Sequence, residues 1–308
     1  MSDWRPTATP DHLRERARLL AQVRHFFAER GVTEVTTPVL TRCGVTDVQI
    51  DSVATDDPAG WLRTSPEYFH KRLLAAGLGD LYELGPVFRR GEQGRFHNPE
   101  FTLLEWYRVG WSWRELAGEV VELFSQVLDD APREVRYRSW RDCFENALDI
   151  NALSADTGSL RALDPNVPAD LNRDQLLDWL FATRIQPELP DGAITVVFDY
   201  PASQAALARL DPDDSRLAQR FEVFIGSLEL ANGYQELTDP AEQRRRFERD
   251  NRLRHELGRE IMPVDGALLD ALATGLPECS GVAVGFDRLL MAWTGAGSIS
   301  EVVPFASC

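Results

Sequence analysis

Basic residues are too few in this sequence for a typical nucleic-acid-binding protein. Lys and Arg together number 33 against 49 Asp and Glu, which gives a formal net charge of -16 at pH 7 over 308 residues. Binding along a phosphate backbone depends on clustered Lys and Arg that release counterions. The charge balance therefore disfavours a polynucleotide as the main partner.

Cysteines and long apolar runs are also scarce. The four cysteines are Cys43, Cys143, Cys279 and Cys308, and they form neither a CxxC pair for zinc nor a disulfide framework. We expect reduced thiols in a cytoplasmic protein. No segment approaches the ~18 apolar residues that cross a bilayer, and the N-terminus lacks the pattern of a signal peptide. A membrane location is therefore not expected.

What is present is the composition of a globular protein, with 44% apolar and 27% charged residues. Neither an internal repeat nor a low-complexity linker divides the chain, so we expect one compact domain over residues 1–308. Apolar spacing predicts helices over residues 10–30, 67–76, 116–128 and 174–183. Ser65 can cap the second of these, and the middle third is otherwise hard to interpret.

Two further segments are predicted to be strands. Residues 193–200 form a near-continuous apolar run that suits a central place in a sheet. Residues 31–40 are apolar but contain Pro38, which cannot donate to a ladder and so favours an edge strand. Such an edge is either exposed or covered by a second subunit.

The stretch FRRGEQGRFHNPEFTLLEWY, residues 88–107, predicts a hairpin of strands 83–89 and 101–108 around a glycine-containing loop. The period-two alternation of a strand places Phe101, Leu103, Glu105 and Tyr107 on one face. An aromatic ring beside an arginine suits a nucleotide base and phosphate. The alternative is a charged hairpin that is simply exposed.

The stretch FEVFIGSLELANGYQEL, residues 221–237, predicts a second hairpin that turns at Gly226-Ser227. In that register Glu222 lies on the same face as Glu229, one diagonal step away. Two carboxylates that close repel each other unless a proton or cation intervenes. The pair therefore favours Mg²⁺ binding over a solvated face.

The stretch CSGVAVGFDRLL, residues 279–290, predicts a short strand followed by a helix that Asp287 and Arg288 begin. Glycines at 281 and 285 allow close approach of the backbone to a ligand, and Arg288 could reach a terminal phosphate. The alternative is an ordinary strand-to-helix turn with an Asp–Arg pair.

Together these pieces resemble the three signature motifs of class II aminoacyl-tRNA synthetases. Residues 31–40 resemble motif 1, which builds the dimer interface in that family; Phe88-Arg89 with His97 and Phe101 resembles motif 2; and residues 285–288 resemble motif 3. The stretches HNPEFTLLEWY and ELANGYQEL are similar to the lysine subclass. Only about ten residues precede the first helix, so we expect no anticodon-binding domain of the kind that lysyl-tRNA synthetases have, and no tRNA partner is expected.

A lysyl-synthetase-like catalytic domain of this kind resembles the EpmA family of elongation factor P–(R)-β-lysine ligases. The resemblance implies an α+β fold, a mainly antiparallel β-sheet flanked by helices, in a homodimer. It further implies an ATP-dependent enzyme that activates (R)-β-lysine, or more weakly L-lysine, as an adenylate and transfers it to a lysine of elongation factor P.

The resemblance also implies roles for individual residues. ATP would be held by Arg89, His97, Asn98, Phe101, Glu229, Leu230, Gly285 and Arg288, with Arg89 and Arg288 as the catalytic pair. Mg²⁺ would be held by Glu222 and Glu229. The amino acid would be held by Ser65, Pro66, Glu67, Glu105, Tyr107, Asn232, Glu236 and Ala283, with Glu67 and Glu105 at the reacting end and Tyr107 and Glu236 at the side-chain ammonium.

Two positions depart from the family patterns. Gly91 stands where motif 2 usually has a glutamate, so that Glu92 or backbone atoms would have to make its contact. Ala283 stands where lysyl-tRNA synthetases tend to have glycine, and we expect the added methyl group to favour a β-amino acid.

Two rival functions remain open. One is a lysine-activating ligase with another amine acceptor. The other is an inactive paralogue that serves as a regulatory subunit, against which the retention of Arg89, Glu222, Glu229 and Arg288 argues. The sequence does not identify the base for the transfer step.

Overall fold

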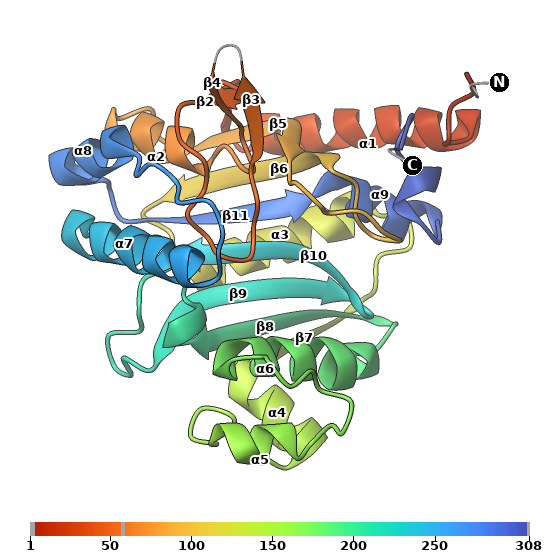
Figure 1. The fold of residues 1–308 in the computed structure, drawn as a ribbon. Coiled ribbons are helices and arrows are strands. Elements are labelled where there is room, and N and C mark those ends of the chain that lie inside the picture. The colour runs from red at the N-terminus through yellow and green to blue at the C-terminus, as the bar shows by residue number, and fades with distance from the viewer. Residues whose placement is uncertain (1–3, 57–58, 307–308) are drawn as a thin grey trace.

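The computed structural model describes residues 4–56 and 59–306, and Cys308 lies outside them. Its strands are β1 (Thr33–Glu34), β2 (Leu40–Thr41), β3 (Val53–Asp56), β4 (Ala59–Leu62), β5 (Leu81–Phe88), β6 (Glu100–Val109), β7 (Glu134–Ser139), β8 (Ala193–Pro201), β9 (Leu217–Ile225), β10 (Leu228–Gln235) and β11 (Cys279–Gly285). Eight of them form one sheet in the order β1-β5-β6-β11-β10-β9-β8-β7, and the other three form a small sheet in the order β2-β4-β3 (Figure 1).

Antiparallel pairing dominates the large sheet. From β5 to β8 every neighbouring pair is antiparallel, whereas β1 with β5 and β7 with β8 are parallel. The small sheet is antiparallel throughout. The expectation of a mainly antiparallel sheet flanked by helices is therefore confirmed.

The α-helices are α1 (Pro10–Glu29), α2 (Glu67–Ala75), α3 (Trp113–Val127), α4 (Trp140–Leu148), α5 (Thr157–Arg161), α6 (Arg173–Leu180), α7 (Pro240–Glu256), α8 (Gly266–Gly275) and α9 (Phe286–Thr294). Phe181–Ile185 continues α6 as a π-helical turn, and 3₁₀ turns occur at Gln186–Glu188, Ala202–Gln204 and Ile299–Glu301. Within the described residues, no helix is long and apolar enough to cross a membrane.

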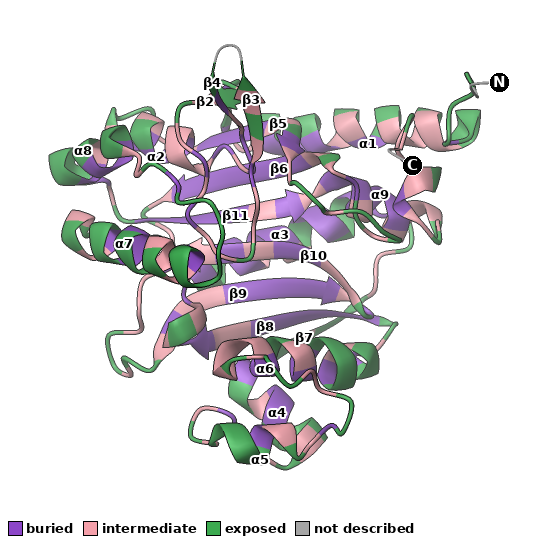
Figure 2. Cartoon of the chain, viewed as in Figure 1, coloured by how far each residue is buried: buried purple, intermediate pink, exposed green. Residues whose placement is uncertain are grey.

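The main core lies between the large sheet and the helices α1, α3 and α9. Phe27 of α1, Phe124 of α3 and Leu289 of α9 are completely buried there against residues of the sheet such as Trp106. Figure 2 shows the buried residues concentrated along the central strands. Smaller clusters join α4, α5 and α6 to β8 and β9, and α2 and α8 to α7. The opposite face of the central strands is left open for a cavity.

The helices predicted from apolar spacing are present, and their ends agree with the prediction to within three residues. The segment 31–40 differs, because it forms only β1 and β2 and not one strand. Pro38 has no N–H to donate, and the N–H of Thr37 is directed at the carboxylate of Glu83, 3.2 Å from each oxygen. The edge position of β1 is as predicted, and β8 lies inside the sheet, next to its edge strand.

The middle third contains more structure than its sequence indicates. Residues 129–190 hold β7, α4 and α5 in addition to the predicted α6. The helices α4 and α5 are short, so each shows too few turns for a clear apolar period. They are stabilised by tertiary packing around Trp140 and Phe144, which sit in one buried cluster.

Candidate functional site

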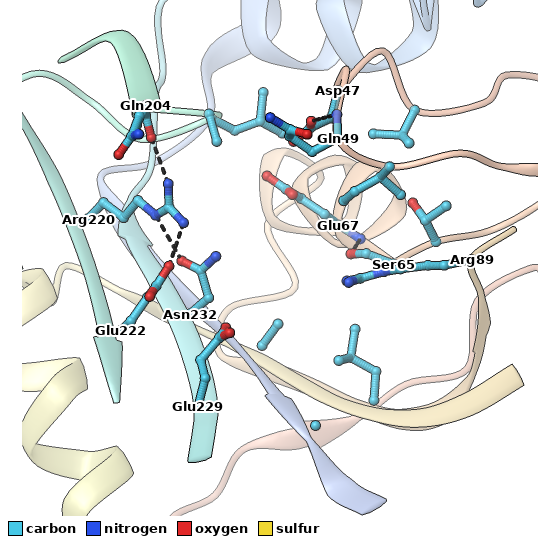
Figure 3. Close-up of a pocket in the computed structure, with 18 of the residues that line it drawn as sticks. Asp47, Gln49, Ser65, Glu67, Arg89, Gln204, Arg220, Glu222, Glu229 and Asn232 are labelled. Atoms are coloured by element: carbon cyan, nitrogen blue, oxygen red, sulfur yellow. Dashed lines mark hydrogen bonds and ion pairs between the residues drawn. The ribbon is translucent and has the colours of Figure 1, made fainter. Parts of the chain in front are cut away.

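A cavity of about 800 Å³ opens on the sheet face away from α1 and α3, and the start of α9 reaches it through Asp287 and Arg288. Its floor comes from β6, β9, β10 and β11, and its walls come from the start of α2, from α6 and α7, and from the loop between β2 and β3. Figure 3 shows labelled side chains of β9, β10, the start of α2 and the loop between β2 and β3 around one space. The three stretches that the sequence singled out all contribute to it.

The face of β6 predicted from its alternation is the face that lines the cavity. Phe101, Leu103, Glu105 and Tyr107 all border it, whereas Leu104 and Trp106 are buried in the main core. The strand pairs antiparallel with β5, with Phe101 opposite Val87. The predicted hairpin is therefore confirmed, and the alternative of a charged hairpin that is merely exposed to solvent is wrong.

One end of the cavity combines aromatic and cationic groups. The guanidinium carbon of Arg89 lies 5.1 Å from the ring centroid of Phe101. Nη1 of Arg89 also lies 3.4 Å from Oε1 of Glu92, which borders the cavity. Glu92 thus provides a carboxylate one residue after Gly91, the position at which motif 2 usually has a glutamate. A flat ring beside a planar cation can bind a nucleotide base and its phosphate.

Arg288 is held at the same end by three contacts. Its Nη2 lies 2.6 Å from Nε2 of His97, and its other nitrogens donate to the carbonyl oxygens of Phe96 at 3.2 Å and Glu229 at 3.1 Å. Burial, followed by the nearby charge of Arg288, lowers the pKa of His97. The imidazole is therefore neutral at physiological pH, and its Nε2 can accept the Arg288 N–H.

The remaining nucleotide candidates also border the cavity. Asn98 is buried and donates from Nδ2 to the carbonyl of Glu100 at 2.5 Å. Leu230 packs its side chain into the main core, so its backbone is what it offers to the cavity. A Cβ added to Gly285 would lie 3.6 Å from the Arg288 side chain, an ordinary contact, so the protein itself leaves room there.

The other end of the cavity is rich in carboxylates. The hydroxyl of Tyr107 donates to Oε1 of Glu105 at 2.8 Å, and Ser65 Oγ donates to Oε2 at 2.7 Å. Ser65 Oγ also accepts the N–H of Glu67 at 3.0 Å, while Pro66 occupies the N-cap position of α2. Burial raises the pKa of Glu105 to about 8, and the charge of Glu67 adds to the shift. This end suits a ligand with ammonium groups.

Lys71 lies behind the carboxylate end, in contact with two of its lining residues, and its role was not predicted from the sequence. Its Nζ lies 2.6 Å from Oε1 of Glu67 and 2.6 Å from Oε2 of Glu236, with 1% of its side chain exposed. A lysine four residues after a glutamate on a helix usually forms a surface ion pair, so the spacing of Glu67 and Lys71 does not by itself predict a buried site. The overlooked signal is that Lys71 is the only lysine among 308 residues.

The second hairpin has the predicted register at its turn. Leu228 pairs with Ile225 and Glu229 with Phe224, after which a bulge places Asn232 opposite Glu222. Figure 3 shows Glu222 and Glu229 directed into the same space. The shared face of the two carboxylates is therefore as predicted.

Arg220 changes how this pair of carboxylates can bind a metal, and the sequence reasoning missed it. Glu222 has one oxygen 2.5 Å from Arg220 Nη2 and accepts a 2.6 Å hydrogen bond from Tyr200 on the other. Glu229 is partly exposed and has a 3.6 Å contact with Arg288. Among the described residues, no group of three or more His, Cys, Asp or Glu side chains could hold a metal ion.

These contacts fit Mg²⁺ only in the form in which it usually binds nucleotides. Mg²⁺ commonly uses one or two carboxylates and completes its shell with substrate phosphates and water. Glu229 is available for this, whereas Arg220 and Tyr200 engage both oxygens of Glu222. Glu229 thus fits a phosphate-bound Mg²⁺, and the pair does not fit an all-protein site.

The floor at the carboxylate end is made of small residues. Ala283 on β11 pairs with Glu105 on one side and with Asn232 on the other. Asn232 accepts a 3.3 Å hydrogen bond from Arg220. Ala283 thus lies on the floor between the carboxylate end and the Arg220 cluster, where a change of one methyl group alters the shape of the site.

The loop between β2 and β3 covers part of the cavity, and no local sequence pattern predicts this placement. Asp47, Gln49 and Ile50 border the cavity. Arg254 of α7 holds the loop by donating to the carbonyls of Asp47 at 2.8 Å and Ile50 at 3.2 Å. The contact joins residues some 200 positions apart, so only the folded structure reveals it.

Known proteins resemble the chain along its whole length. The family described as tRNA synthetases class II (D, K and N) matches residues 1–308. An elongation factor P–(R)-β-lysine ligase of Photorhabdus laumondii is 46% identical, with 99% of this chain and 98% of the relative aligned. The ligase of the same name from Erwinia tasmaniensis is 47% identical over the same shares, and that from Salmonella dublin is 46% identical over 98% and 97%. The resemblance found in the motifs is confirmed, and the chain belongs to the family of class II tRNA synthetases (D, K and N).

Proposed function

We propose that the protein is an ATP-dependent ligase that activates (R)-β-lysine, and L-lysine more weakly, and transfers it to a lysine side chain of elongation factor P. Support comes from full-length relatives that carry this name at 46–47% identity. The observation that carries the proposal is the composition of one cavity, in which an arginine–aromatic end meets a carboxylate end. An aminoacyl adenylate has the matching two halves.

At the first end, adenine lies on Phe101 and the α-phosphate is held by Arg89. Arg288, fixed by His97 and the Glu229 carbonyl, takes the second side of the base or the terminal phosphate. Mg²⁺, when bound, neutralises phosphate charge, and Glu229 is the residue best placed to hold it. Positioning and charge stabilisation of this kind account for most of the catalysis in adenylate formation.

At the second end, carboxylates receive the two ammonium groups of the amino acid. Glu67 and Glu105 take the amine of the reacting end, while Tyr107 and Glu236 take the amine of the side chain. Ser65 fixes both sides of this arrangement, since it binds Glu105 and the backbone of Glu67. Charge-assisted hydrogen bonds are about twice as strong as neutral ones, so two of them select a diamine.

The reaction has two steps. A carboxylate oxygen of the amino acid attacks the α-phosphorus, and pyrophosphate leaves. The amine of the partner's lysine then attacks the acyl carbon, the bond from that carbon to the phosphate oxygen breaks, AMP leaves, and the amine loses a proton.

Pyrophosphate exchange and intact mass test the proposal. With ATP, Mg²⁺ and (R)-β-lysine, labelled pyrophosphate should enter ATP, and L-lysine should support slower exchange. Elongation factor P added to the same mixture should gain the mass of one lysyl group. No exchange with either isomer would favour the inactive paralogue, and exchange without modification of the factor would favour another amine acceptor.

The same proposal includes a homodimer of single catalytic units in the cytoplasm, where a translation factor acts. Its support is the resemblance of residues 31–40 to the dimer motif and the edge position of β1. Sedimentation equilibrium should give twice the mass of the 34.7 kDa chain. A monomer mass at micromolar concentration would contradict it.

A further inference from the structure

Lys71 is an unusual side chain beside the cavity, because it is a buried cation in contact with two carboxylates of the end that should bind cations. It lies in the middle of α2, and its Nζ bridges Glu67 and Glu236 at 2.6 Å each. Burial by itself would lower the pKa of Lys71, but the two carboxylates outweigh burial and raise it above its ordinary value. The ammonium is therefore permanently charged and cannot act as a base or nucleophile.

The bridge leaves one oxygen of each carboxylate for a ligand. Glu67 uses Oε1 and Glu236 uses Oε2 to contact Lys71. Oε1 of Glu236 is buried and has no hydrogen-bonding partner among the described residues, and Glu236 borders the cavity. A buried carboxylate oxygen without a donor is costly, so it indicates a missing donor that the ligand supplies.

Lys71 also sets the charge of this end. Glu67, Glu105 and Glu236 lie close enough to influence one another, and burial raises the pKa of Glu236 while Lys71 opposes the rise. The groups that face Glu236 are Lys71 and Glu67 from α2, Glu105 and Tyr107 from β6, and Cys279 from β11. Of these, Lys71 is the cation, so without it Glu236 would retain a proton and bind an ammonium poorly.

We propose that Lys71 is a positioning residue for the amino-acid substrate, holding Glu67 and Glu236 apart and oriented so that each presents its free oxygen to a substrate ammonium. The inference rests on the proposed function. Lys71 would also contribute to substrate specificity, because its Nζ sets the spacing between the free oxygens of Glu67 and Glu236. Diamines whose amines fit that spacing are favoured over monoamines.

Kinetics of the variant Lys71→Met test the proposal, because methionine keeps most of the unbranched apolar chain of lysine and removes the ammonium charge. The amino-acid KM in pyrophosphate exchange should rise at least tenfold at pH 7, while the KM for ATP stays within twofold. The amino-acid KM should recover toward pH 8.5 as Glu236 ionises, and Lys71→Arg should restore part of the affinity. An unchanged amino-acid KM, or an equal rise in both KM values, would overturn the proposal.

Glu236→Gln gives a second comparison that does not depend on the single variant folding. When Glu236 is neutral, Lys71 has less to orient, so adding Lys71→Met to Glu236→Gln should raise the amino-acid KM by much less than tenfold over Glu236→Gln alone. If the single variant does not fold, the pair still compares with Glu236→Gln. A further tenfold loss in the pair would count against action through Glu236.

The wild-type protein allows a direct test, because its single lysine gives a single side-chain NMR signal after ¹⁵N-lysine labelling. The ammonium resonance should persist from pH 6 to 9 and shift when L-lysine is added, but not when a non-hydrolysable ATP analogue is added. An unmoved signal in an enzyme that shows lysine-dependent exchange overturns this inference alone. Absence of exchange in the wild type points instead to failure of the proposed function.

A second observation concerns the rest of the basic residues. Of the 33 Lys and Arg, 32 are Arg, and the Lys and Arg residues that line the cavity are all arginines: Arg89, Arg220, Arg249, Arg259 and Arg288. A lysine amine attacks an acyl adenylate, forms an amide and expels AMP with loss of a proton. A guanidinium stays protonated and does not react in this way.

We infer that the chain is protected from acylation by its own adenylate, which is thereby reserved for the amine of the partner. Arg249 is half-exposed at the cavity rim beside Asp250, and Arg136 is a matched arginine beside Glu134 on β7, outside the cavity lining. This inference also rests on the proposed function. Pyrophosphate exchange by the wild type is therefore measured first, so that failure of the proposed function can be told apart from failure of this inference.

Peptide mass mapping after incubation with ATP, Mg²⁺ and (R)-β-lysine, without elongation factor P, tests it. The wild type should carry no lysyl adduct on a side chain, Arg249→Lys should acquire one at residue 249, and Arg136→Lys should acquire at least tenfold less. An adduct on Lys71 of the active wild type, or equal labelling of the two variants, would overturn the inference.

Discussion

Gly281 lies directly opposite Tyr107 in the ladder between β11 and β6, and a Cβ at Gly281 would come within 2.3 Å of Cε1 of the Tyr107 ring. The same Cβ would lie 2.5 Å from Oε1 of Glu236. Both side chains lean over the glycine to reach the cavity. A backbone without a side chain is therefore what allows the phenol and the carboxylate to share one end of the site.

Gly281→Ala should raise the amino-acid KM tenfold or more, because Tyr107 or Glu236 must move to admit the methyl group. The KM for ATP should change little. Gly118→Ala is the control: a Cβ at Gly118 meets no atom within 4 Å, and Ala for Gly inside α3 should stabilise the fold by about 0.5–1 kcal/mol. Equal kinetics for the two variants in pyrophosphate exchange would contradict the role of Gly281.

Ala283→Gly should shift the preference of the site toward L-lysine. Ala283 pairs with Glu105, so its methyl group occupies the floor beside the carboxylate that meets the reacting end. Removing it makes room for the amine one carbon closer to the carboxylate. One methyl group discriminates by about 1–3 kcal/mol, so the ratio of kcat/KM for the two isomers should change about 10- to 200-fold. An unchanged ratio would remove Ala283 from this role.

The alternation of one strand was enough to predict much of this site. Period-two spacing placed Glu105 and Tyr107 on one face, and the Gly226-Ser227 turn fixed the register that brings Glu222 and Glu229 together. Both are local properties, since strand geometry and turn type depend on adjacent residues. The main sheet and its faces were therefore accessible from sequence.

Contacts between segments far apart in the chain could not be predicted from the local sequence. Lys71 on α2 meets Glu236 at the end of β10, and Arg254 of α7 holds the loop at Asp47. Neither pair shares a period or a turn, so nothing in the local sequence distinguishes these cations from surface ones. Arg220 was overlooked for a related reason, because only the folded structure shows its guanidinium turned onto Glu222.

Amino-acid binding should depend on pH through Glu105. Burial raises the pKa of Glu105 to about 8, with Glu67 next in importance, so the empty site holds a proton at pH 7. An ammonium must displace that proton, and the amino-acid KM should therefore fall as pH rises from 6 to 8. Calorimetry in buffers of different ionisation enthalpy should show proton release on binding, and Glu105→Gln should abolish this release.

In the ligand-free protein, the stability contributed by Glu105 should fall as pH rises, whereas amino-acid binding improves. The folded-state pKa of Glu105 lies above its ordinary value, so its protonated form stabilises the fold at low pH, and this contribution is lost as pH rises through about 8. The melting temperature of the free wild type should therefore fall more between pH 6.5 and 8.5 than that of Glu105→Gln. Parallel curves for the two proteins would show that the carboxyl ionises normally.

Phe101→Ala should weaken ATP binding and leave amino-acid binding nearly intact. The ring lies 5.1 Å from Arg89 at the end of the cavity away from Lys71, and stacking of a base on an aromatic ring contributes about 1–3 kcal/mol. The KM for ATP should rise roughly 5- to 150-fold on that basis. Phe305→Ala, which removes a ring that is 67% exposed and lies outside the cavity lining, is the control. A loss confined to the amino-acid KM would place the nucleotide elsewhere.

Glu229→Gln and Glu222→Gln should separate metal binding from structural support. Glu229 is partly exposed, with its carboxylate 3.6 Å from Arg288, so its neutral variant should fold normally but need several-fold more Mg²⁺ for half-maximal exchange. Glu222 is buried between Arg220 and Tyr200, so its variant leaves Arg220 without its carboxylate partner. Breaking a buried ion pair costs about 3–5 kcal/mol, which should appear as a clearly lower melting temperature. If both variants melt like the wild type and show the same Mg²⁺ dependence, neither assignment stands.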